Sequence, residues 1–454
     1  MTKDYNALII GAGLTGMSSA FHLKNDYAIV EKEKVVGGLV RTEQRGEYLF
    51  DYTGHWLHLR RPYIKKFVSD ILGVELTKIN KKSKIYSYGV FTEYPFQANL
   101  FGLPTPVVKE CLMGFIETNI KRKDESCFKG NSFMDYIEYY FGHGISKHFF
   151  IPFNKKLFGV HPKDITSRWC GRFVPKPTIE EVINGTLGIN NLPLGYNSSF
   201  FYPSFQGIGM ISEKLKERVA NLYLQTRLEK IDLNKRIAYF NDFEIKFKYL
   251  INTSPLNHFL RCINNLPKEI EDIIPELKST KVNYLIMGVR KKVLKGLHWI
   301  YFPEAKYPFY RIGCFNNAIP YFSPTGKSSL YVEISNDYHS ERLKNKVLNS
   351  VIELLKDFGD IESEEDIEFC EYKSIPIAYV IHDENHFDYT NRIHGYLEEN
   401  GIYSIGRYGK WTYNAMEDAL YEGYLISEKL KQRKTYDDRK KSGTQGLYSN
   451  SGVQ

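Results

Sequence analysis

The sequence lacks the closely spaced cysteines of disulfide-rich and zinc-binding proteins. Its 454 residues include six cysteines, at positions 111, 127, 170, 262, 314 and 370, and none forms a CxxC pair. This spacing is typical of a reduced chain with isolated thiols. We therefore expect a cytoplasmic location.

Long hydrophobic runs are also missing. No stretch approaches the 18 apolar residues of a membrane-spanning helix, so the sequence predicts no membrane span. The first apolar run, "ALII" at residues 7–10, is short and leads directly into a glycine turn. We therefore expect no signal peptide.

The charge shows no basic track of the kind that binds nucleic acid. The chain has 61 Lys and Arg against 53 Asp and Glu, a net charge of +8. The lysines are scattered, and runs such as "INKKSKI" are typical of solvated faces. We expect no nucleic-acid partner, whereas a small anionic substrate suits the sign of the charge.

Motifs for metal-dependent or nucleophilic catalysis are missing as well. No nucleophile triad or metal-ligand set is visible, and the sequence predicts no metal site. "HDENH" at 382–386 is interpreted as a solvated polar turn rather than a metal site. "PTGKSS" at 324–329 lacks the first glycine of a phosphate loop. The sequence therefore indicates that a cofactor carries the chemistry.

Aromatic residues, in contrast, are abundant. They make up 15% of the chain, with 34 Tyr and 29 Phe. The stretch "YFPEAKYPFYR" at 301–311 combines five aromatics, two prolines and a closing arginine. Because proline donates no backbone hydrogen bond, this stretch cannot all be a central strand. Its prolines favour one fixed shape for a binding loop.

The N-terminal segment carries a dinucleotide-binding pattern. Gly11, Gly13 and Gly16 follow a predicted strand and open a predicted helix, and Glu31 ends the next strand. The glycines let the backbone approach a pyrophosphate at the helix N-terminus, and the glutamate accepts a hydrogen bond from a ribose hydroxyl. Strand, helix and acid in register make this signal strong.

The remaining pattern predicts an α/β fold. Long helical patterns occupy 103–150, a strand meander occupies 228–253, and helices are expected at 340–359 and 415–433. We expect a Rossmann-like cofactor domain with an inserted helical lobe and an antiparallel-sheet substrate domain. The predicted division is cofactor domain, first part, 1–100; helical insertion, 101–192; cofactor domain, middle part with the meander, 193–282; substrate-binding sheet domain, 283–398; C-terminal return to the cofactor domain, 399–432; and disordered tail, 433–454.

Further motifs resemble FAD-binding flavoproteins of the amine oxidase and protoporphyrinogen oxidase type. They are the glycine pair Gly37-Gly38 followed by Arg41, "TGHW" at 53–56, and "GIYSIGRYGKW" at 401–411 before a helix. The resemblance implies FAD as cofactor. It implies cofactor contacts from Gly11, Gly13, Gly16, Glu31, Gly38, Arg41, Gly54, His55, Gly406, Arg407 and Met416.

Within that superfamily, the chain resembles the UDP-galactopyranose mutase family, nearer its eukaryotic branch. The resemblance rests on "EYPFQANL" at 93–100, "FNKKLFGV" at 153–160, "NSSFFYP" at 197–203, the aromatic stretch at 301–311 and "GRYGKWTY" at 406–413. It implies interconversion of pyranose and furanose forms of UDP-galactose or a related nucleotide sugar. In this chemistry N5 of reduced flavin attacks the anomeric carbon and UDP leaves and returns, with no net redox change.

The mutase resemblance also implies roles for individual residues. A diphosphate clamp would consist of Arg311, Arg407, Tyr301, Tyr379 and Tyr413. A uracil pocket would consist of Tyr94, Phe96, Gln97, Asn154 and Phe158, with Asn197 on the sugar side. Catalytic positions would be His55, Gly54, Arg172 and Arg311. Lys176 is the alternative to Arg172 for the cation facing the flavin, because Arg172 is one position out of register.

Three departures from the mutase pattern keep other functions open. Phe158 stands where the family usually has tryptophan, the flavin loop carries Trp56 and His58, and Tyr379 is not followed by proline. The alternatives are an FAD-dependent oxidoreductase, a non-catalytic FAD-bound scaffold, and a mutase for another nucleotide sugar. The reductant, NAD(P)H or another, and the oligomeric state also stay open.

Overall fold

The first sheet is built around the strand that precedes the glycine turn. The computed structural model describes residues 2–122, 128–170, 173–189, 198–334 and 340–441, with side chains as far as Arg433. Strand β1 (Thr2–Ile10) pairs in parallel with β12 (Glu244–Asn252) on one side and β2 (Tyr27–Val30) on the other. Residues 7–10 are buried. A continuous apolar run of this kind is typical of a central parallel strand.

The same sheet collects strands from distant parts of the chain. Its order is β10-β11-β12-β1-β2-β9, with β18 beside β12. The additional strands are β9 (Leu222–Tyr223), β10 (Leu228–Asp232), β11 (Ile237–Phe240) and β18 (Ile402–Ser404). The expected meander is confirmed, since β10, β11 and β12 are consecutive antiparallel neighbours. The parallel pairing of β18 with β12 brings the C-terminal segment back to the cofactor core.

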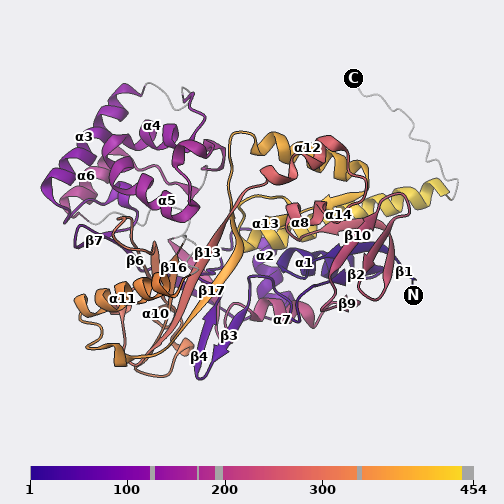
Figure 1. The fold of residues 1–454 in the computed structure, drawn as a ribbon, viewed down its shortest axis with the longest axis horizontal. Coiled ribbons are helices and arrows are strands. Elements are labelled where there is room, and N and C mark those ends of the chain that lie inside the picture. The colour runs from indigo at the N-terminus through magenta and orange to yellow at the C-terminus, as the bar shows by residue number, and fades with distance from the viewer. Residues whose placement is uncertain (1, 123–127, 171–172, 190–197, 335–339, 442–454) are drawn as a thin grey trace, which may run out of the picture.

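Two helices that are far apart in sequence pack together over this core. Helix α1 (Leu14–Leu23) follows the glycine turn, and α14 (Met416–Lys441) crosses it (Figure 1). The sequence predicted a tail from residue 433, but α14 continues to Lys441. The other helices of this part are α2 (Pro62–Lys66), α7 (Met210–Lys216), α8 (Leu256–Leu260), α9 (Lys268–Glu271), α12 (His386–Glu399) and α13 (Gly406–Gly409).

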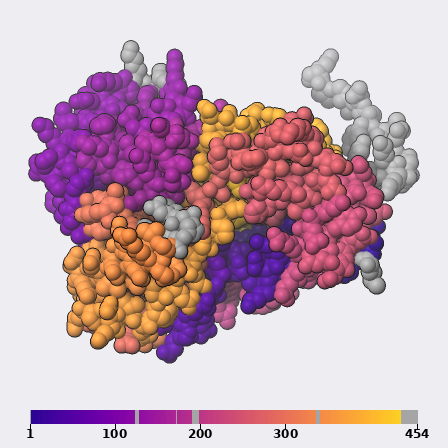
Figure 2. Space-filling model, viewed as in Figure 1, coloured from indigo at the N-terminus to yellow at the C-terminus, as the bar shows by residue number. Residues whose placement is uncertain are grey.

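A helical lobe lies at one end of the molecule and has its own hydrophobic core (Figures 1 and 2). Its helices are α3 (Thr105–Lys121), α4 (Phe133–Ile145), α5 (Ile151–Phe158) and α6 (Ile179–Leu187). Capping boxes begin two of them, at Ser132 for α4 and Thr178 for α6. Each box satisfies backbone N–H groups that a helix start leaves unpaired.

The second sheet has seven strands in the order β17-β13-β16-β15-β14-β6-β7 and is antiparallel except between β14 and β6. Its strands are β6 (Ser83–Ser87), β7 (Val90–Glu93), β13 (Ser279–Val289), β14 (Trp299–Tyr301), β15 (Arg311–Cys314), β16 (Ser328–Ile334) and β17 (Ile367–Val380). Helices α10 (Phe315–Ala318) and α11 (Glu341–Asp357) complete this domain. Strands β6 and β7 fall in the predicted first part of the cofactor domain, yet they pair in this second sheet. The aromatic stretch forms β14, a loop and the start of β15, as its prolines indicated.

Two short ladders connect the domains. Strands β3 (Thr42–Arg45) and β4 (Tyr48–Asp51) form one, and β5 (Leu76–Asn80) and β8 (Ser199–Pro203) form the other. The segment that leaves β4 carries the predicted flavin loop. Over the part of the chain that the structure describes, no helix is both long and apolar enough to cross a membrane.

Candidate active site

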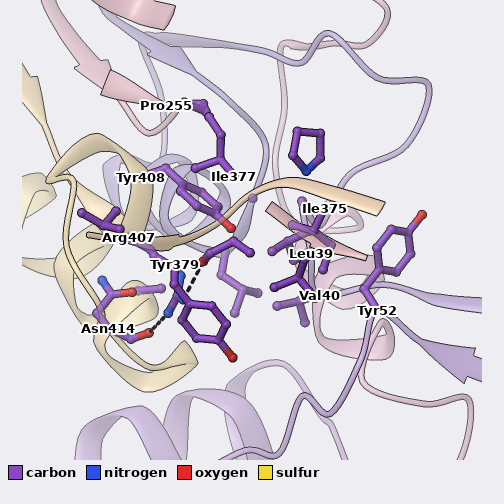
Figure 3. A pocket seen from close by; sticks show the side chains of 18 of the residues that line it. Leu39, Val40, Tyr52, Pro255, Ile375, Ile377, Tyr379, Arg407, Tyr408 and Asn414 are labelled. Atoms are coloured by element: carbon purple, nitrogen blue, oxygen red, sulfur yellow. Dashed lines mark hydrogen bonds between the residues drawn. The ribbon is translucent and has the colours of Figure 1, made fainter. Parts of the chain in front are cut away.

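A cavity of about 1350 Å³ extends from the glycine turn to the helical lobe. It is bordered by the β1–α1 turn, the β4 loop, strand β17 and the segment before α14. Figure 3 shows Arg407, Tyr379 and Asn414 grouped on one side of the pocket and Leu39, Val40 and Tyr52 on the other. The predicted cofactor and clamp residues can therefore be located relative to one continuous space.

The glycine turn forms the end of the cavity that suits a pyrophosphate. Gly11 has φ +99°, and a Cβ on Gly16 would lie 2.0 Å from the Gly11 carbonyl oxygen. A Cβ on Gly13, in contrast, would meet no atom within 4 Å, so the space before α1 is open. No side chain caps α1 at Gly13, so its first N–H groups remain available to an anion.

Glu31 lies beside this turn, as predicted for the ribose acid. Its Oε2 accepts a hydrogen bond from the Ala12 N–H at 2.8 Å, and its Oε1 accepts one from the Glu33 N–H at 2.9 Å. These bonds hold the carboxylate at the cavity wall. Each carboxylate oxygen has a second lone-pair site, so both can still accept from a ribose hydroxyl.

Gly38 and Arg41 continue the cofactor wall. The Arg41 Nε donates to the Gly38 carbonyl at 2.5 Å, and its guanidinium lies 4.9 Å from the centre of the Tyr52 ring. Gly38 and Arg41 both line the cavity. Arg41 is thus fixed by its own loop beside the predicted flavin site.

The Thr53–His55 segment has a constrained backbone. Thr53, a β-branched residue, has φ +64°, which is strained for such a side chain. A Cβ on Gly54 would lie 2.6 Å from the Tyr331 hydroxyl, so only glycine fits there. Burial, followed by the charge of Arg407, lowers the pKa of His55 to about 4. His55 therefore lines the cavity as a neutral ring near pH 7.

Trp56, a departure from the mutase pattern, packs into the cavity wall. Its ring stacks on Trp299 with centroids 5.4 Å apart and planes inclined by 17°. His58 also lines the cavity, and burial lowers its pKa to about 4. These side chains narrow the space next to Gly54.

Arg311 is held by a buried carboxylate. Its Nε donates to Glu333 Oε2 at 2.9 Å and its Nη2 donates to Oε1 at 2.6 Å. Glu333 is 1% exposed, and both side chains line the cavity. A bidentate pair of this kind fixes the plane of the guanidinium.

Arg407 faces the same cavity from the C-terminal segment (Figure 3). Its two terminal nitrogens donate to the Asn414 carbonyl at 3.0 Å and the Ala378 carbonyl at 2.9 Å. Its guanidinium carbon lies 4.6 Å from the ring centre of Tyr413 and 5.5 Å from that of Tyr379. Arg407, Tyr379 and Tyr413 thus form one group, as the clamp prediction requires.

Tyr301 completes the set on the side of Arg311. It stacks on Tyr94, with ring centroids 5.3 Å apart, and the Arg311 guanidinium carbon lies 6.0 Å from its ring centre. Tyr94, Tyr301 and Arg311 all line the cavity. The predicted clamp residues from residue 301 to residue 413 therefore face one shared space.

Three residues predicted for the base pocket lie elsewhere. Phe96 is 0% exposed and stacks on Phe149 in the core of the helical lobe. Gln97 donates to the Pro175 carbonyl, and Asn154 donates to the Phe150 carbonyl. None of the three lines the cavity as the structure describes it. The three side chains pack in the lobe's core, whereas Phe158 lines the cavity, and their contact with a base stays a prediction.

Of the remaining predicted positions, Met416 lines the cavity, whereas the others lie elsewhere or outside the described residues. Gly406, with φ +77°, gives its N–H to Glu422 at 2.6 Å and packs on Thr15, while Met416 lines the cavity. Lys176 is exposed and lies over Tyr140 of the lobe, with its ammonium 3.7 Å from the ring centre. Arg172 and Asn197 lie outside the described residues.

The "HDENH" segment is not the solvated turn that was expected. His382 and His386 are 4% and 5% exposed, and their ring centroids are 4.2 Å apart. The prediction was wrong because both histidine rings are buried, and only Glu384 and Asn385 between them are exposed. Within the described ranges, no three His, Cys, Asp or Glu side chains gather as a metal site.

Sequence reasoning missed several cavity residues. They are Phe153, Trp169, Phe173, Tyr310, Glu333, His382, Tyr408 and Asn414. Glu333 carried a signal, because it is the single charged residue of the strand "SSLYVEI", all of which is buried. A lone buried acid requires a cationic partner. Asn414 and Tyr408 gave no comparable signal.

The fold and this cavity define a class of protein, a dinucleotide-binding enzyme whose cofactor domain is joined to a second, largely antiparallel sheet. The family model described as flavin containing amine oxidoreductase matches residues 14–430. The chain therefore belongs to this flavoenzyme family, and FAD is its cofactor. The open turn at Gly13, the carboxylate of Glu31 and the tight loop at Gly54 fit that cofactor.

The individual proteins that this chain resembles have low sequence identity to it. A crystal structure of reduced UDP-galactopyranose mutase is 24% identical, with TM-score 0.87, over 94% of this chain and 96% of that one. Putrescine oxidase bound to putrescine is 15% identical, with TM-score 0.63, over 95% and 100%. A Dictyostelium discoideum protein named "Probable flavin-containing monoamine oxidase A" is 28% identical over 116 residues. That match spans 23% of this chain and 25% of the Dictyostelium protein. These structural matches establish the fold, and the reaction has to be inferred from the residues of the site.

Proposed function

We propose that this flavoenzyme is a nucleotide-sugar mutase that interconverts pyranose and furanose forms of UDP-galactose or a related UDP-sugar. The observation that carries the proposal is the convergence of Arg311, Arg407 and their tyrosines on the cavity beside Gly54 and His55. Bound in its reduced state, FAD supplies a nucleophilic ring nitrogen, N5, for the anomeric carbon. The protein's own task is then to hold UDP while it is detached from the sugar.

The two guanidinium groups suit that task. An arginine has five N–H donors. Two on Arg311 meet Glu333, and two on Arg407 meet carbonyl oxygens, so these bonds leave part of each guanidinium to face the cavity and a diphosphate. Bonds between charged groups contribute roughly 1.5–3 kcal/mol each. A leaving group held this way stays within reach for return to the sugar.

An amine oxidase is the second candidate, since the family and the putrescine oxidase fold both include that chemistry. The site disfavours it. A cationic amine would meet the guanidiniums of both Arg311 and Arg407 in this cavity, and of these two only Arg311 is paired with a carboxylate. Like charges at short distance repel strongly where water is excluded.

Activity with reduced and oxidised protein decides between the two. We expect the dithionite-reduced protein to interconvert UDP-galactopyranose and UDP-galactofuranose, separated by chromatography, and the oxidised protein to be inactive. Steady oxygen consumption with an amine such as putrescine, together with no sugar interconversion, would support the oxidase instead. The donor of electrons, NAD(P)H or another reductant, can be identified in the same assay.

A further inference from the structure

Lys156 of the helical lobe makes an unusual set of contacts with the aromatic loop of the substrate sheet. Its Nζ donates to the carbonyl oxygens of Phe302 at 2.8 Å, Glu304 at 2.5 Å and Phe309 at 2.9 Å. An ammonium has three N–H donors and no acceptor. The three carbonyls of this loop therefore match its donors one to one.

The loop is built to present those carbonyls. The Phe302 N–H donates to the Tyr310 carbonyl at 2.9 Å, which closes the loop at its base, and the Tyr310 N–H donates to the Glu333 carbonyl at 3.0 Å. Phe302 and Phe309 are 0% and 1% exposed, so their carbonyls have little access to water. Buried carbonyls without a donor are costly, and Lys156 supplies the donors.

Both partners of this contact carry cavity residues. On α5, Phe153 precedes Lys156 by one helical turn, and Leu157 and Phe158 follow it directly; all three line the cavity. Tyr301, Tyr310 and Arg311 line it from the two ends of the loop. Phe153 also meets Tyr301 and Tyr310 edge-on, with ring centroids 5.6 and 6.1 Å apart.

We infer that Lys156 is a positioning residue for the nucleotide diphosphate, which fixes the aromatic wall of α5 against the loop that ends in Arg311. It acts through Tyr301, Tyr310 and Arg311 and does not itself line the cavity. This inference rests on the proposed function, because it assigns a positioning residue to the nucleotide-binding end of that same site. The aromatic and proline-rich loop is then explained as a rigid frame around a single ammonium.

The test measures UDP binding to the FAD-loaded protein by calorimetry. Lys156→Met keeps the length of the side chain and removes all three donors, so we expect UDP affinity to fall at least tenfold. The FAD content and flavin absorbance spectrum are expected to match wild type. Lys155→Met, at the exposed neighbouring position of α5, is expected to stay within twofold. In turnover, the KM of Lys156→Met rises while kcat changes less than threefold; unchanged UDP affinity would overturn the inference.

Hydrogen exchange separates this inference from the proposed function. Without nucleotide, the amides of residues 302–310 are expected to exchange at least tenfold faster in Lys156→Met than in wild type, and equal rates would overturn the inference. Failure of wild type to bind UDP would instead count against the mutase. If Lys156→Met does not fold, Lys156→Arg provides the test, since a planar guanidinium cannot direct three N–H bonds from one nitrogen to the three carbonyl oxygens. Its UDP affinity should fall at least threefold, and wild-type affinity would refute the positioning role.

Discussion

The two arginines of the predicted diphosphate clamp have different local partners. Arg311 is neutralised by buried Glu333, whereas Arg407 is held by carbonyl oxygens and forms no ion pair among the described residues. Arg407 therefore brings the uncompensated positive charge. We expect Arg407→Ala to weaken UDP binding by about 10- to 100-fold, the equivalent of one charged hydrogen bond, with little change in the melting temperature. Arg392→Ala, on the exposed face of α12, is the calorimetric control; equal effects of the two would contradict this assignment.

Substitution of Arg311, in contrast, should lower the stability of the fold. Its removal leaves the Glu333 carboxylate buried without a partner, which typically costs about 3–5 kcal/mol. We expect Arg311→Ala to lower the free energy of unfolding by that amount in denaturant titrations. The double variant Arg311→Ala/Glu333→Ala removes the unpaired charge as well and should recover part of the loss. A double variant less stable than Arg311→Ala would show that the pair is not the cause.

Asp51, at the end of β4, gives the stability of the fold a pH dependence. Burial raises its pKa to about 7 despite hydrogen bonds from Thr42 and Tyr202. A carboxyl with a raised folded-state pKa stabilises fully below its unfolded value, near 3.8, and loses that contribution as the pH rises through about 7. Asp51→Asn does not titrate, so the stability difference between variant and wild type should move in favour of the variant from pH 5 to pH 8, by about 3 kcal/mol. Urea titrations at both values measure it; a difference independent of pH would exclude Asp51 as the titrating group.

At the scale of the elements, the segment after β4 is a constrained part of the cavity wall. A Cβ at Gly54 would lie 2.6 Å from the Tyr331 hydroxyl and 2.9 Å from Trp56 Nε1. Gly54→Ala must therefore displace the loop beside the flavin, and we expect FAD content after purification to fall by more than half. Gly395→Ala, in helix α12 with no atom within 4 Å of the new Cβ, is the matched control and should retain full FAD. Full FAD retention by Gly54→Ala would show that the loop can shift without weakening FAD binding, and it would contradict this prediction.

The elements with a strong local pattern were predictable from sequence. The glycine turn with Glu31, the meander before Asn252 and the helix that begins at Met416 all have periodicity or turn residues that specify them locally. The aromatic stretch gave its own boundaries through proline. Pairings between distant segments could not be read this way, because nothing local in residues 83–93 specifies which sheet they join.

The residues of the site also divide into those that sequence motifs could predict and those that they could not. Arg311, Arg407 and their tyrosines were found because several motifs occurred together in order. Phe96, Gln97 and Asn154 were placed in a base pocket, but their side chains pack or bond inside the helical lobe, and only the three-dimensional fold decides which face of α5 is turned to the cavity. Trp169 and Asn414 enter the cavity through chain packing that no spacing predicts.

At the scale of the whole molecule, the cofactor core depends on the return of the C-terminal segment to the N-terminal turn. Helix α14 crosses α1 so closely that a Cβ on Gly423 would lie 2.6 Å from Ser18 Cβ and 2.7 Å from the Thr15 carbonyl oxygen. The contact is reinforced by the Ser427 hydroxyl, which donates to the Ser19 carbonyl at 3.0 Å.

This crossing packs α14, whose first residue Met416 lines the cavity, against the helix that follows the glycine turn. We therefore expect cofactor and clamp to depend on one helix contact. We expect Gly423→Val to force α14 away from α1 and to lower the melting temperature, FAD content and UDP affinity together, since overpacking typically costs about 1–3 kcal/mol. Leu425→Ser, at an exposed position of the same helix (46% exposed), should change none of the three. Thermal unfolding followed by flavin fluorescence and calorimetry with UDP measures them. Loss of UDP affinity with unchanged FAD content and stability would mean that the clamp is positioned independently of the α1–α14 crossing.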